Sequence, residues 1–158
     1  MERLIIISPQ FENDDWIPDS CAGYGYDRSP ELYIEGIPAG TISLAVVMDD
    51  LDHPIRPGYN HWVAWNIPPI GVIPGRMPTG EILDRPIHIE QGIAYGKHCY
   101  RGPKPPFNLL HRYRFTVYAL STKLQLSSDS DKNDLLSAID GHVLAQGELF
   151  GKYRRKHK

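Results

Sequence analysis

The chain has 158 residues, of which 41% are hydrophobic and 23% charged, and its formal net charge is −2. This length supports one domain over residues 1–158 with a sizeable buried core. A slightly acidic chain lacks the positive field that attracts nucleic acid, and no apolar run is long enough for a membrane span or a signal peptide. We therefore expect a cytoplasmic protein with no nucleic-acid partner and no stable membrane insertion.

The first half of the chain is predicted to be built from strands joined by turns. An N-terminal apolar run forms a first strand ending at Pro9, residues 20–30 form a glycine-punctuated loop, and residues 31–35 alternate as a short strand. Residues 41–48 are the clearest strand, rich in β-branched residues and nearly all apolar at their end. This pattern predicts a central strand that runs directly into a group of aspartates.

Further strands follow. In residues 61–67, alternation places His61, Val63 and Trp65 on one side. Residues 68–86 are rich in Gly and Pro and are predicted to form a long surface connection, whereas residues 87–95 fit neither a strand nor a helix clearly. Residues 112–120 alternate well and indicate a half-buried strand.

The C-terminal part is predicted to be helical. Asp131 is a suitable N-cap, and acidic Asp134 falls in the first turn of a helix whose apolar residues have helical spacing. Gly141 interrupts this helix, and residues 142–150 are predicted to form a second short one. Strands followed by a helical end indicate an α+β or mainly β architecture.

Two segments at strand ends carry polar chemistry. Asp50 follows the predicted central strand, and Pro54 restrains the loop behind it, although such a stretch also fits an ordinary solvated turn. His61 begins an otherwise apolar strand, where a histidine is often a satisfied structural group. The two residues are separated by one short loop, so their strands are expected to be neighbours.

Residues 100–106 read Tyr-Arg-Gly-Pro-Lys-Pro-Pro and predict a stiff loop. Gly102 permits the close approach of a ligand, and the three prolines restrict the backbone. A stiff loop keeps a pocket open without an entropic cost of ordering on binding. The alternatives are a proline-rich surface turn and a ligand for a polyproline-binding domain.

His111 and Tyr113 point to the same face of their strand and, with His61, supply directional donors for phosphate oxygens. The structural alternative is a tyrosine with a satisfied hydroxyl beside a core histidine. Asp50 would repel a phosphate, and it fits such a pocket in two ways. It either orients His61 and favours its protonated form, or it contacts a protonated phosphate hydroxyl or a ligand ammonium.

Several other site classes find little support. The chain has no Gly-x-Ser-x-Gly and no Gly-x-x-x-x-Gly-Lys-Ser/Thr motif. Its histidines lack a recognised metal-ligand spacing, so we expect no metal and no cofactor. A low-activity hydrolase that uses His61 and Asp50 as a general base pair is the alternative enzymatic hypothesis. Cys21 and Cys99 are expected to be free thiols in a reducing compartment.

These segments, in this order, resemble the signatures of the phosphatidylethanolamine-binding protein family, which contains the Raf kinase inhibitor protein, and most strongly its bacterial and archaeal branch. Residues 50–54 are similar to the family's Asp-Pro-Asp-Ala-Pro, and residues 61–68 to its bacterial His-Trp-Val-x-x-Asn-x-Pro. Residues 100–106 and 111–113 are similar to a third signature. The resemblance covers nearly the whole chain.

The resemblance implies a mainly β, sandwich-like fold with short peripheral and C-terminal helices. It also implies a small pocket for phosphate, acetate or a phosphoethanolamine head group. Carried over by motif, the ligand-binding residues are Asp50, His61, Tyr100, Gly102, Pro105, Pro106, His111 and Tyr113, with Pro54 and Tyr59 at the rim. Trp62 and Trp65 would then belong to the framework.

The family further implies a non-enzymatic regulatory role, by inhibiting a kinase or protease or by scaffolding, and the sequence leaves open whether the chain forms a homodimer. The chain departs from the family pattern at the rim, where Leu51, His53 and Leu110 replace a proline, an alanine and a glycine. Residues 107–110 are also more apolar than usual. This loop motivates a third hypothesis, a protein-interaction module that acts through its surface rather than its pocket.

Overall fold

The computed structural model describes residues 2–56 and 58–155, so Met1, Pro57 and residues 156–158 of the predicted domain lie outside the described part. In chain order its elements are β1 (Glu2–Arg3), β2 (Ile5–Ile7), β3 (Asp15–Trp16), the short 3-10 helix η1 (Asp19–Cys21), β4 (Leu32–Glu35), β5 (Ser43–Asp50), β6 (Tyr59–Ile67), β7 (Val72–Ile73), β8 (Ile82–Leu83), β9 (Ile89–Gln91), β10 (His111–Leu120), α1 (Lys132–Ile139) and β11 (Val143–Tyr153). No helix among these residues is long and apolar enough to cross a bilayer.

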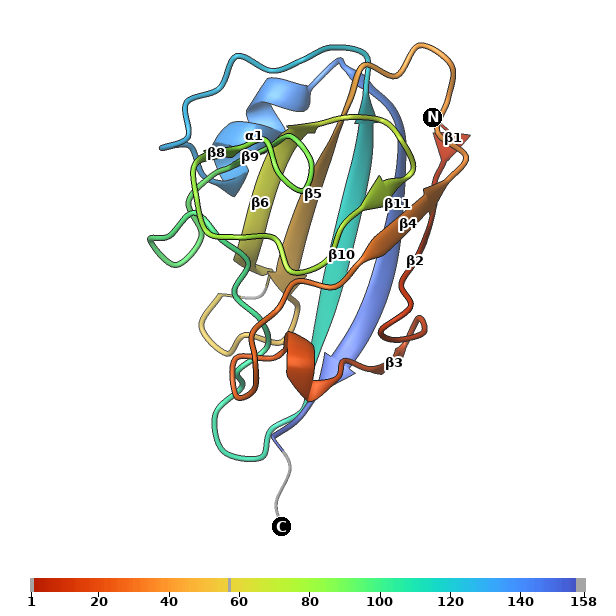
Figure 1. Cartoon of the computed structure of the whole chain (residues 1–158). Coiled ribbons are helices and arrows are strands. Elements are labelled where there is room, and N and C mark those ends of the chain that lie inside the picture. Colours follow the sequence, from red (N-terminus) through yellow and green to blue (C-terminus); the bar gives the residue numbers. More distant parts are fainter. Residues whose placement is uncertain (1, 57, 156–158) are drawn as a thin grey trace.

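Two β-sheets form the body of the protein (Figure 1). The larger, eight-stranded sheet has the order β1-β11-β10-β5-β6-β9-β8, and β3 pairs with β11 outside this path. The smaller sheet has the order β2-β4-β7. All residues of β5 are buried, and the strand lies between β10 and β6, as predicted for a central strand. The fold is therefore mainly β with one short α-helix.

Each face of the large sheet has its own hydrophobic core. On one face, the small sheet contributes Leu32 and Ile73, which pack in the same cluster as Met48 and Trp62 of the large sheet. The opposite face carries a second cluster that includes Trp65 and residues of α1. Both tryptophans are fully buried, which agrees with the framework role that the family resemblance implies. The large sheet thus lies between the small sheet and the helix.

Helix α1 begins where the sequence predicts. The Asp131 side chain accepts a hydrogen bond from the backbone N–H of Asp134, and the Asp134 side chain accepts one from the backbone N–H of Asp131. This reciprocal capping box satisfies two backbone donors that the first helical turn leaves without partners. Leu135 and Ile139 then direct the apolar side of the helix toward the sheet.

The predicted second helix over residues 142–150 is wrong, because this segment lies in strand β11 (Val143–Tyr153). Its burial alternates with a period of two, and β11 pairs along its length with β10. Residues such as Ala145 and Leu149 have high helix propensity, but sheet pairing overrides that preference. A side chain at Gly147 would place its Cβ 2.2 Å from the carbonyl oxygen of Leu4, so the glycine lets the N-terminal segment lie directly on β11.

Smaller differences concern the connections. The N-terminal segment 2–7 forms two short strands in different sheets, and only β2 belongs to the apolar run that predicts a single strand. The long connection 68–86 contains the two-residue strands β7 and β8, and the ambiguous segment 87–95 contributes β9 to the large sheet. Cys21 and Cys99 are both free, as predicted.

Candidate functional site

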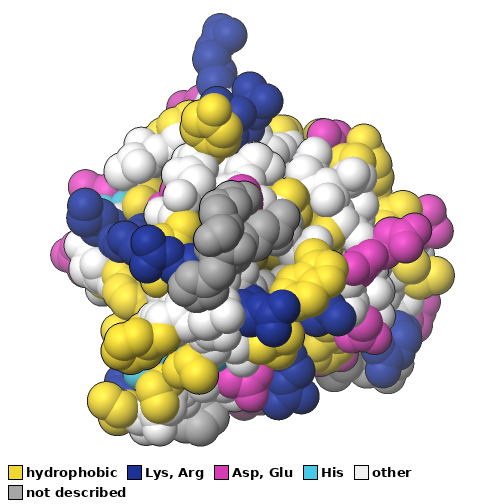
Figure 2. Space-filling model, turned by 90° about the horizontal axis from the view of Figure 1, so that it is seen from below, with side chains coloured by type: hydrophobic (Ala, Val, Ile, Leu, Met, Phe, Trp, Pro, Cys, Tyr) yellow, Lys and Arg dark blue, Asp and Glu magenta, His cyan; other side chains and the backbone are white. Residues whose placement is uncertain are grey.

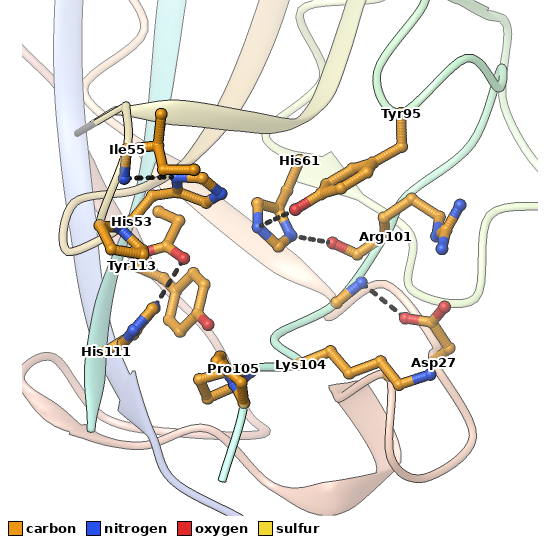
Figure 3. Close-up of a pocket in the computed structure, with 15 residues that line it drawn as sticks. Asp27, His53, Ile55, His61, Tyr95, Arg101, Lys104, Pro105, His111 and Tyr113 are labelled. Atoms are coloured by element: carbon orange, nitrogen blue, oxygen red, sulfur yellow. Dashed lines mark hydrogen bonds and ion pairs between the residues drawn. The ribbon is translucent and has the colours of Figure 1, made fainter. Parts of the chain in front are cut away.

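A cavity of about 350 Å³ opens at the end of the large sheet where β5 ends, and Figure 3 shows the side chains that point into it. The β5–β6 connection, the segment 101–106 and the start of β10 contribute most of its walls, and the loop that contains Gly23 and Asp27, His61 of β6, and Tyr95 complete them. Most of the predicted ligand-binding residues line this one cavity: Asp50, Pro54, His61, Gly102, Pro105, Pro106, His111 and Tyr113. The structure therefore brings together residues that are up to 63 positions apart in the sequence, from Asp50 to Tyr113.

Tyr100 and Tyr59 do not line the cavity. Tyr100 is 4% exposed, and its hydroxyl donates a hydrogen bond of 2.7 Å to the carbonyl oxygen of Cys21. Burial raises the pKa of the Tyr100 hydroxyl well above its ordinary value, so it stays a neutral donor. The Tyr59 ring stacks on His53 at 4.7 Å and meets the edge of Tyr95 at 4.9 Å. Both tyrosines therefore support the walls from behind.

A β-bulge turns His61 into the cavity. Trp62 pairs with Met48 and Asn60 pairs with Asp49, so His61 is an extra residue between two paired positions. Strict alternation predicted His61 on the face of Val63 and Trp65, and this prediction is wrong, because those residues belong to the opposite core. A bulge re-aims a side chain in this way and is common next to functional sites.

The His61 ring is fixed by a backbone contact. Its Nδ1 lies 2.6 Å from the carbonyl oxygen of Arg101, so Nδ1 carries the hydrogen and Nε2 is the nitrogen left for other partners. The Tyr95 hydroxyl lies 3.4 Å from Nε2. Burial lowers the pKa of His61 below its ordinary value, and the contact with Arg101 opposes this shift only in part. His61 is therefore neutral at neutral pH when no anion is bound.

Asp50 pairs with His111. Asp50 Oδ2 lies 2.8 Å from His111 Nδ1, and each side chain is 5% exposed. Of the two alternatives for Asp50, the one in which it orients His61 is wrong in that respect, because the register of β5 and β10 sets Asp50 opposite Tyr113, two residues from His111. The charge of Asp50 does favour the protonated form of His61, as that alternative also stated. The pair fixes the His111 ring and leaves Nε2 as its second donor or acceptor.

The hydroxyl of Tyr113 is a buried polar group without a hydrogen-bond partner among the described residues. The backbone N–H of Lys104 faces this oxygen but does not close a hydrogen bond. Burial, together with the nearby charge of Asp50, raises the pKa of Tyr113 far above its ordinary value, so the group is a neutral O–H donor. An unpaired buried donor is costly, and this one belongs to a side chain that lines the cavity.

The opposite wall is held by Gly102. Its backbone N–H donates a hydrogen bond of 2.6 Å to Asp27 Oδ1, so this donor is already engaged. A Cβ at position 102 would lie 2.1 Å from the carbonyl oxygen of Cys21, and therefore only glycine fits between the two loops. The sequence predicts the close approach of a ligand at Gly102, whereas the close approach seen at this residue is that of the protein's own loop.

Several lining residues were not predicted as site residues, among them Asp27, Ile55, Tyr95, Arg101 and Lys104. Arg101 and Lys104 lie inside the segment 100–106, which the sequence marks as a stiff loop. Asp27 belongs to the glycine-punctuated loop, 75 residues before Gly102 in the sequence. No local sequence pattern indicates that Asp27 and Gly102 lie next to each other in the fold.

The rim of the cavity exposes large apolar side chains. Ile55 is 87%, Phe107 81% and Leu109 51% exposed. Ile55 also lines the cavity, and Phe107 directly follows Pro106 of its wall. Seen from below, the molecule carries hydrophobic side chains interspersed with lysine and arginine side chains (Figure 2).

The fold and the cavity together define a small β-sandwich protein with a preformed pocket of histidine, tyrosine and aspartate side chains. A family model described as phosphatidylethanolamine-binding protein matches residues 7–154. A UPF0098 protein of Pyrococcus abyssi is 40% identical over 157 residues, covering 98% of this chain and 88% of the relative. Another UPF0098 protein, from Pyrococcus horikoshii, is 42% identical over 152 residues, covering 95% of this chain and 76% of the relative.

Solved structures agree with these relatives. The Escherichia coli protein YbcL, described as a member of the mammalian PEBP family, superposes with a TM-score of 0.87 at 27% identity, over 98% of this chain and 99% of that one. The Chlamydia trachomatis protein CT736, described as a PEBP homologue, gives a TM-score of 0.86 at 29% identity, over 99% and 100% of the two chains. The chain belongs to the phosphatidylethanolamine-binding protein family, which confirms the resemblance stated above.

Proposed function

We propose that this protein binds a small phosphate-like anion in the cavity and does so without chemical turnover. The observation that carries the proposal is the unpartnered, buried hydroxyl of Tyr113, which shares the cavity with His61 and His111. An anion oxygen beside Tyr113 would accept this hydrogen bond and satisfy the orphan donor. The backbone N–H of Lys104, which faces the same oxygen atom, supplies a second neutral donor.

Because the ligand is an anion, its binding depends on the protonation state of His61. An anion favours the protonated form of a nearby histidine, so binding should raise the pKa of His61 from its lowered value. The bound state is then a protonated His61 that donates from Nε2, while His111 remains oriented by Asp50. At neutral pH, binding is therefore accompanied by the uptake of a proton from solution by His61, unless the ligand binds through its own acidic hydroxyl.

A binding role fits the lining better than a hydrolase does. No serine, threonine or cysteine lines the cavity in the described part of the chain, so the commonest side-chain nucleophiles of hydrolases are lacking there. The proposed pair of His61 and Asp50 is not formed, because Asp50 pairs with His111. Within a family named for binding phosphatidylethanolamine, the ligand is a free phosphate or a phospholipid head group, and the role is regulation of a partner such as a kinase or protease.

The test is an NMR titration with inorganic phosphate that follows histidine ring and backbone amide signals. Saturable shifts should be confined to His61, His111, Lys104 and their neighbours. His61→Ala combined with His111→Ala should abolish them while the protein still unfolds cooperatively. His142→Ala, at an exposed position away from the cavity, is the control and should bind like the parent. Retained binding in the double variant would refute the proposal, and turnover of a phosphomonoester lost with His61→Ala would favour the hydrolase.

A second candidate is a protein-interaction module that acts through the rim. Phe107 is 81% exposed and has a φ of 56°, a left-handed conformation that is unusual for a bulky side chain. Strained residues of this kind concentrate at functional sites, and exposed aromatic residues are common anchors of interfaces. A partner captured by the parent, retained by the double histidine variant but lost with Phe107→Ser, would favour this role over anion binding.

A further inference from the structure

The bulged residue His61 is held on the cavity side by two contacts with one neighbour. The backbone N–H of Arg101 donates to the carbonyl oxygen of His61 at 3.1 Å, and the Arg101 carbonyl oxygen lies 2.6 Å from His61 Nδ1 (Figure 3). The extra residue of β6 is therefore paired with the segment 101–106 instead of with β5. These contacts hold His61 itself, whereas another side chain joins the strand residues beside it.

That side chain is Asn60, the residue before the bulge. Asn60 Nδ2 lies 3.0 Å from the carbonyl oxygen of Met48 on β5 and 2.9 Å from the carbonyl oxygen of Trp62 on β6. Met48 and Trp62 are paired across the two strands, and His61 lies between this pair and the next one. The Asn60 amide thus joins both strands at the point where the ladder admits the extra residue.

The orientation of the Asn60 amide is fixed by its surroundings. Its Nδ2 also lies 3.2 Å from Asp49 Oδ1, so it faces two carbonyl oxygens and a carboxylate oxygen. All three atoms only accept hydrogen bonds, which excludes the reversed orientation with Oδ1 toward them. Asn60 Oδ1 is buried and has no hydrogen-bond partner among the described residues. A buried acceptor without a partner is costly, so the amide is held in place by its nitrogen.

Asp49 is itself held from behind. Its second oxygen, Oδ2, lies 2.9 Å from Lys132 Nζ of α1 and 3.4 Å from the Arg114 guanidinium of β10. Two cations from different elements therefore compensate this buried carboxylate, and its other oxygen remains directed at the Asn60 amide. Asp49 thus fixes the amide against the sheet.

We propose that Asn60 is a positioning residue of the cavity, and that its amide nitrogen fixes the β-bulge that aims the His61 ring at the anion. This inference rests on the proposed anion binding and deepens it, because it names the group that sets the geometry of an anion donor without touching the ligand. Asn60 is not among the residues that line the cavity, so a substitution there removes no ligand contact.

The test compares Asn60→Ala with Asn66→Ala, which removes an asparagine amide from the same strand. Asn66 Nδ2 donates to Glu90 Oε2 at 2.9 Å and to the carbonyl oxygen of Leu124 at 2.8 Å, and these residues do not line the cavity. Both variants should lose stability in urea unfolding, and neither changes the net charge. Only Asn60→Ala should alter the state of His61.

In Asn60→Ala, the His61 ring should leave its buried position. Burial is the largest cause of the lowered pKa of His61, so this pKa, followed by NMR of the ring, should rise toward its ordinary value. The substitution changes none of the charged groups that act on the ring, which are Asp27, Asp49 and Asp50. The fraction of the neutral ring with its hydrogen on Nδ1 should fall. Affinity for inorganic phosphate should fall about tenfold, as for one lost hydrogen bond to a charged group.

A measurement on the parent protein tests the same inference even if Asn60→Ala does not fold. The side-chain amide protons of Asn60 should exchange with solvent at least about tenfold more slowly than those of the exposed Asn133 on α1, because they are engaged between the two strands. Equally fast exchange at both residues would refute the inference.

The outcomes separate the two proposals. If Asn60→Ala keeps the pKa and tautomer of His61 and binds phosphate like the parent, Asn60 is not a positioning residue. The same conclusion follows if Asn66→Ala changes these properties equally, since general destabilisation then explains the effect. If the parent binds no phosphate at millimolar concentration while Asn60→Ala still changes His61, the anion pocket fails and the positioning of His61 by Asn60 stands.

Discussion

His61 Nδ1 lies 2.6 Å from the backbone carbonyl oxygen of Arg101, and this contact joins the bulge in β6 to the segment that forms the opposite wall of the cavity. The carbonyl holds one tautomer of the neutral ring, and burial keeps the ring from being charged. The wall of the pocket thus contains a histidine whose pKa is set by its burial and by this backbone contact.

The first prediction concerns pH and stability. Because the pKa of His61 is lower in the folded protein than its ordinary value, the unfolded chain takes up the proton at a higher pH than the folded protein does. The His61 contribution to stability is therefore intact above about pH 6.5 and is lost as the pH falls through the folded pKa. Urea unfolding between neutral and acidic pH should show a smaller loss for His61→Gln than for the parent.

His88 provides a control, because its pKa is shifted in the opposite direction to that of His61. Hydrogen bonding to Asp84 raises the pKa of His88, so its stabilising contribution is present at acidic pH and is lost as the pH rises through the folded value. His88→Gln should therefore steepen the loss of stability on acidification, whereas His61→Gln should flatten it. Parallel curves for the two variants would contradict the assignment.

The second prediction distinguishes a hydroxyl that binds the ligand, that of Tyr113, from one that stabilises the fold, that of Tyr100. Tyr113→Phe removes a hydroxyl that has no protein partner among the described residues, so stability should stay the same or rise by about 1 kcal/mol. Phosphate affinity should fall roughly tenfold or more, as expected for a lost hydrogen bond to a charged group. Calorimetric titration and thermal unfolding of the same samples measure both effects.

Tyr100→Phe is the matched comparison, because it removes the other buried hydroxyl near the cavity. This hydroxyl bonds to the carbonyl oxygen of Cys21, and its loss should cost about 1 kcal/mol of stability with little change in phosphate affinity. If both variants lose affinity equally, the Tyr113 hydroxyl has no special role in binding.

The third prediction concerns the anchoring of α1. Asp49 is 1% exposed, and its Oδ2 lies 2.9 Å from Lys132 Nζ and 3.4 Å from the Arg114 guanidinium. Lys132→Met should destabilise the protein by about 1–3 kcal/mol, since it weakens the compensation of a buried carboxylate that Arg114 still pairs. The exposed Lys123→Met is the control and should lie within about 0.5 kcal/mol of the parent.

The fourth prediction tests the contact between the two loops of the pocket. Gly102→Ala places a Cβ against the backbone of Cys21 and against the Asp27 side chain, so a loop must move. We expect a loss of about 2 kcal/mol or more in denaturant unfolding, together with shifted amide signals at Asp27. An unchanged spectrum with full stability would show that the loops separate easily.

Much of the fold follows from local pattern. The buried run of β5, the alternation of β10 and the capping box of α1 are all properties of neighbouring residues, and each was predictable. Strand β11 was not, because its residues favour a helix locally and its burial is imposed by pairing with β10, β1 and β3. The secondary structure of such a segment is set by its pairing with strands distant in sequence, and not by the intrinsic propensity of its residues.

The residue types of the pocket can be read from the sequence, because the histidines, the tyrosine, the aspartate and the stiff proline-rich wall stand in four short segments that mark the family. Tertiary structure alone decided which groups meet. The bulge that turns His61 inward, the pairing of Asp50 with His111, and the approach of Asp27 to Gly102 depend on register and on loop contacts between residues far apart in the chain. The alternation of a sequence predicts which face of the sheet each strand residue points to. One extra residue in a strand, a β-bulge, moves the side chains beyond it to the opposite face. The position of the bulge is fixed only when the strand pairs with its neighbours.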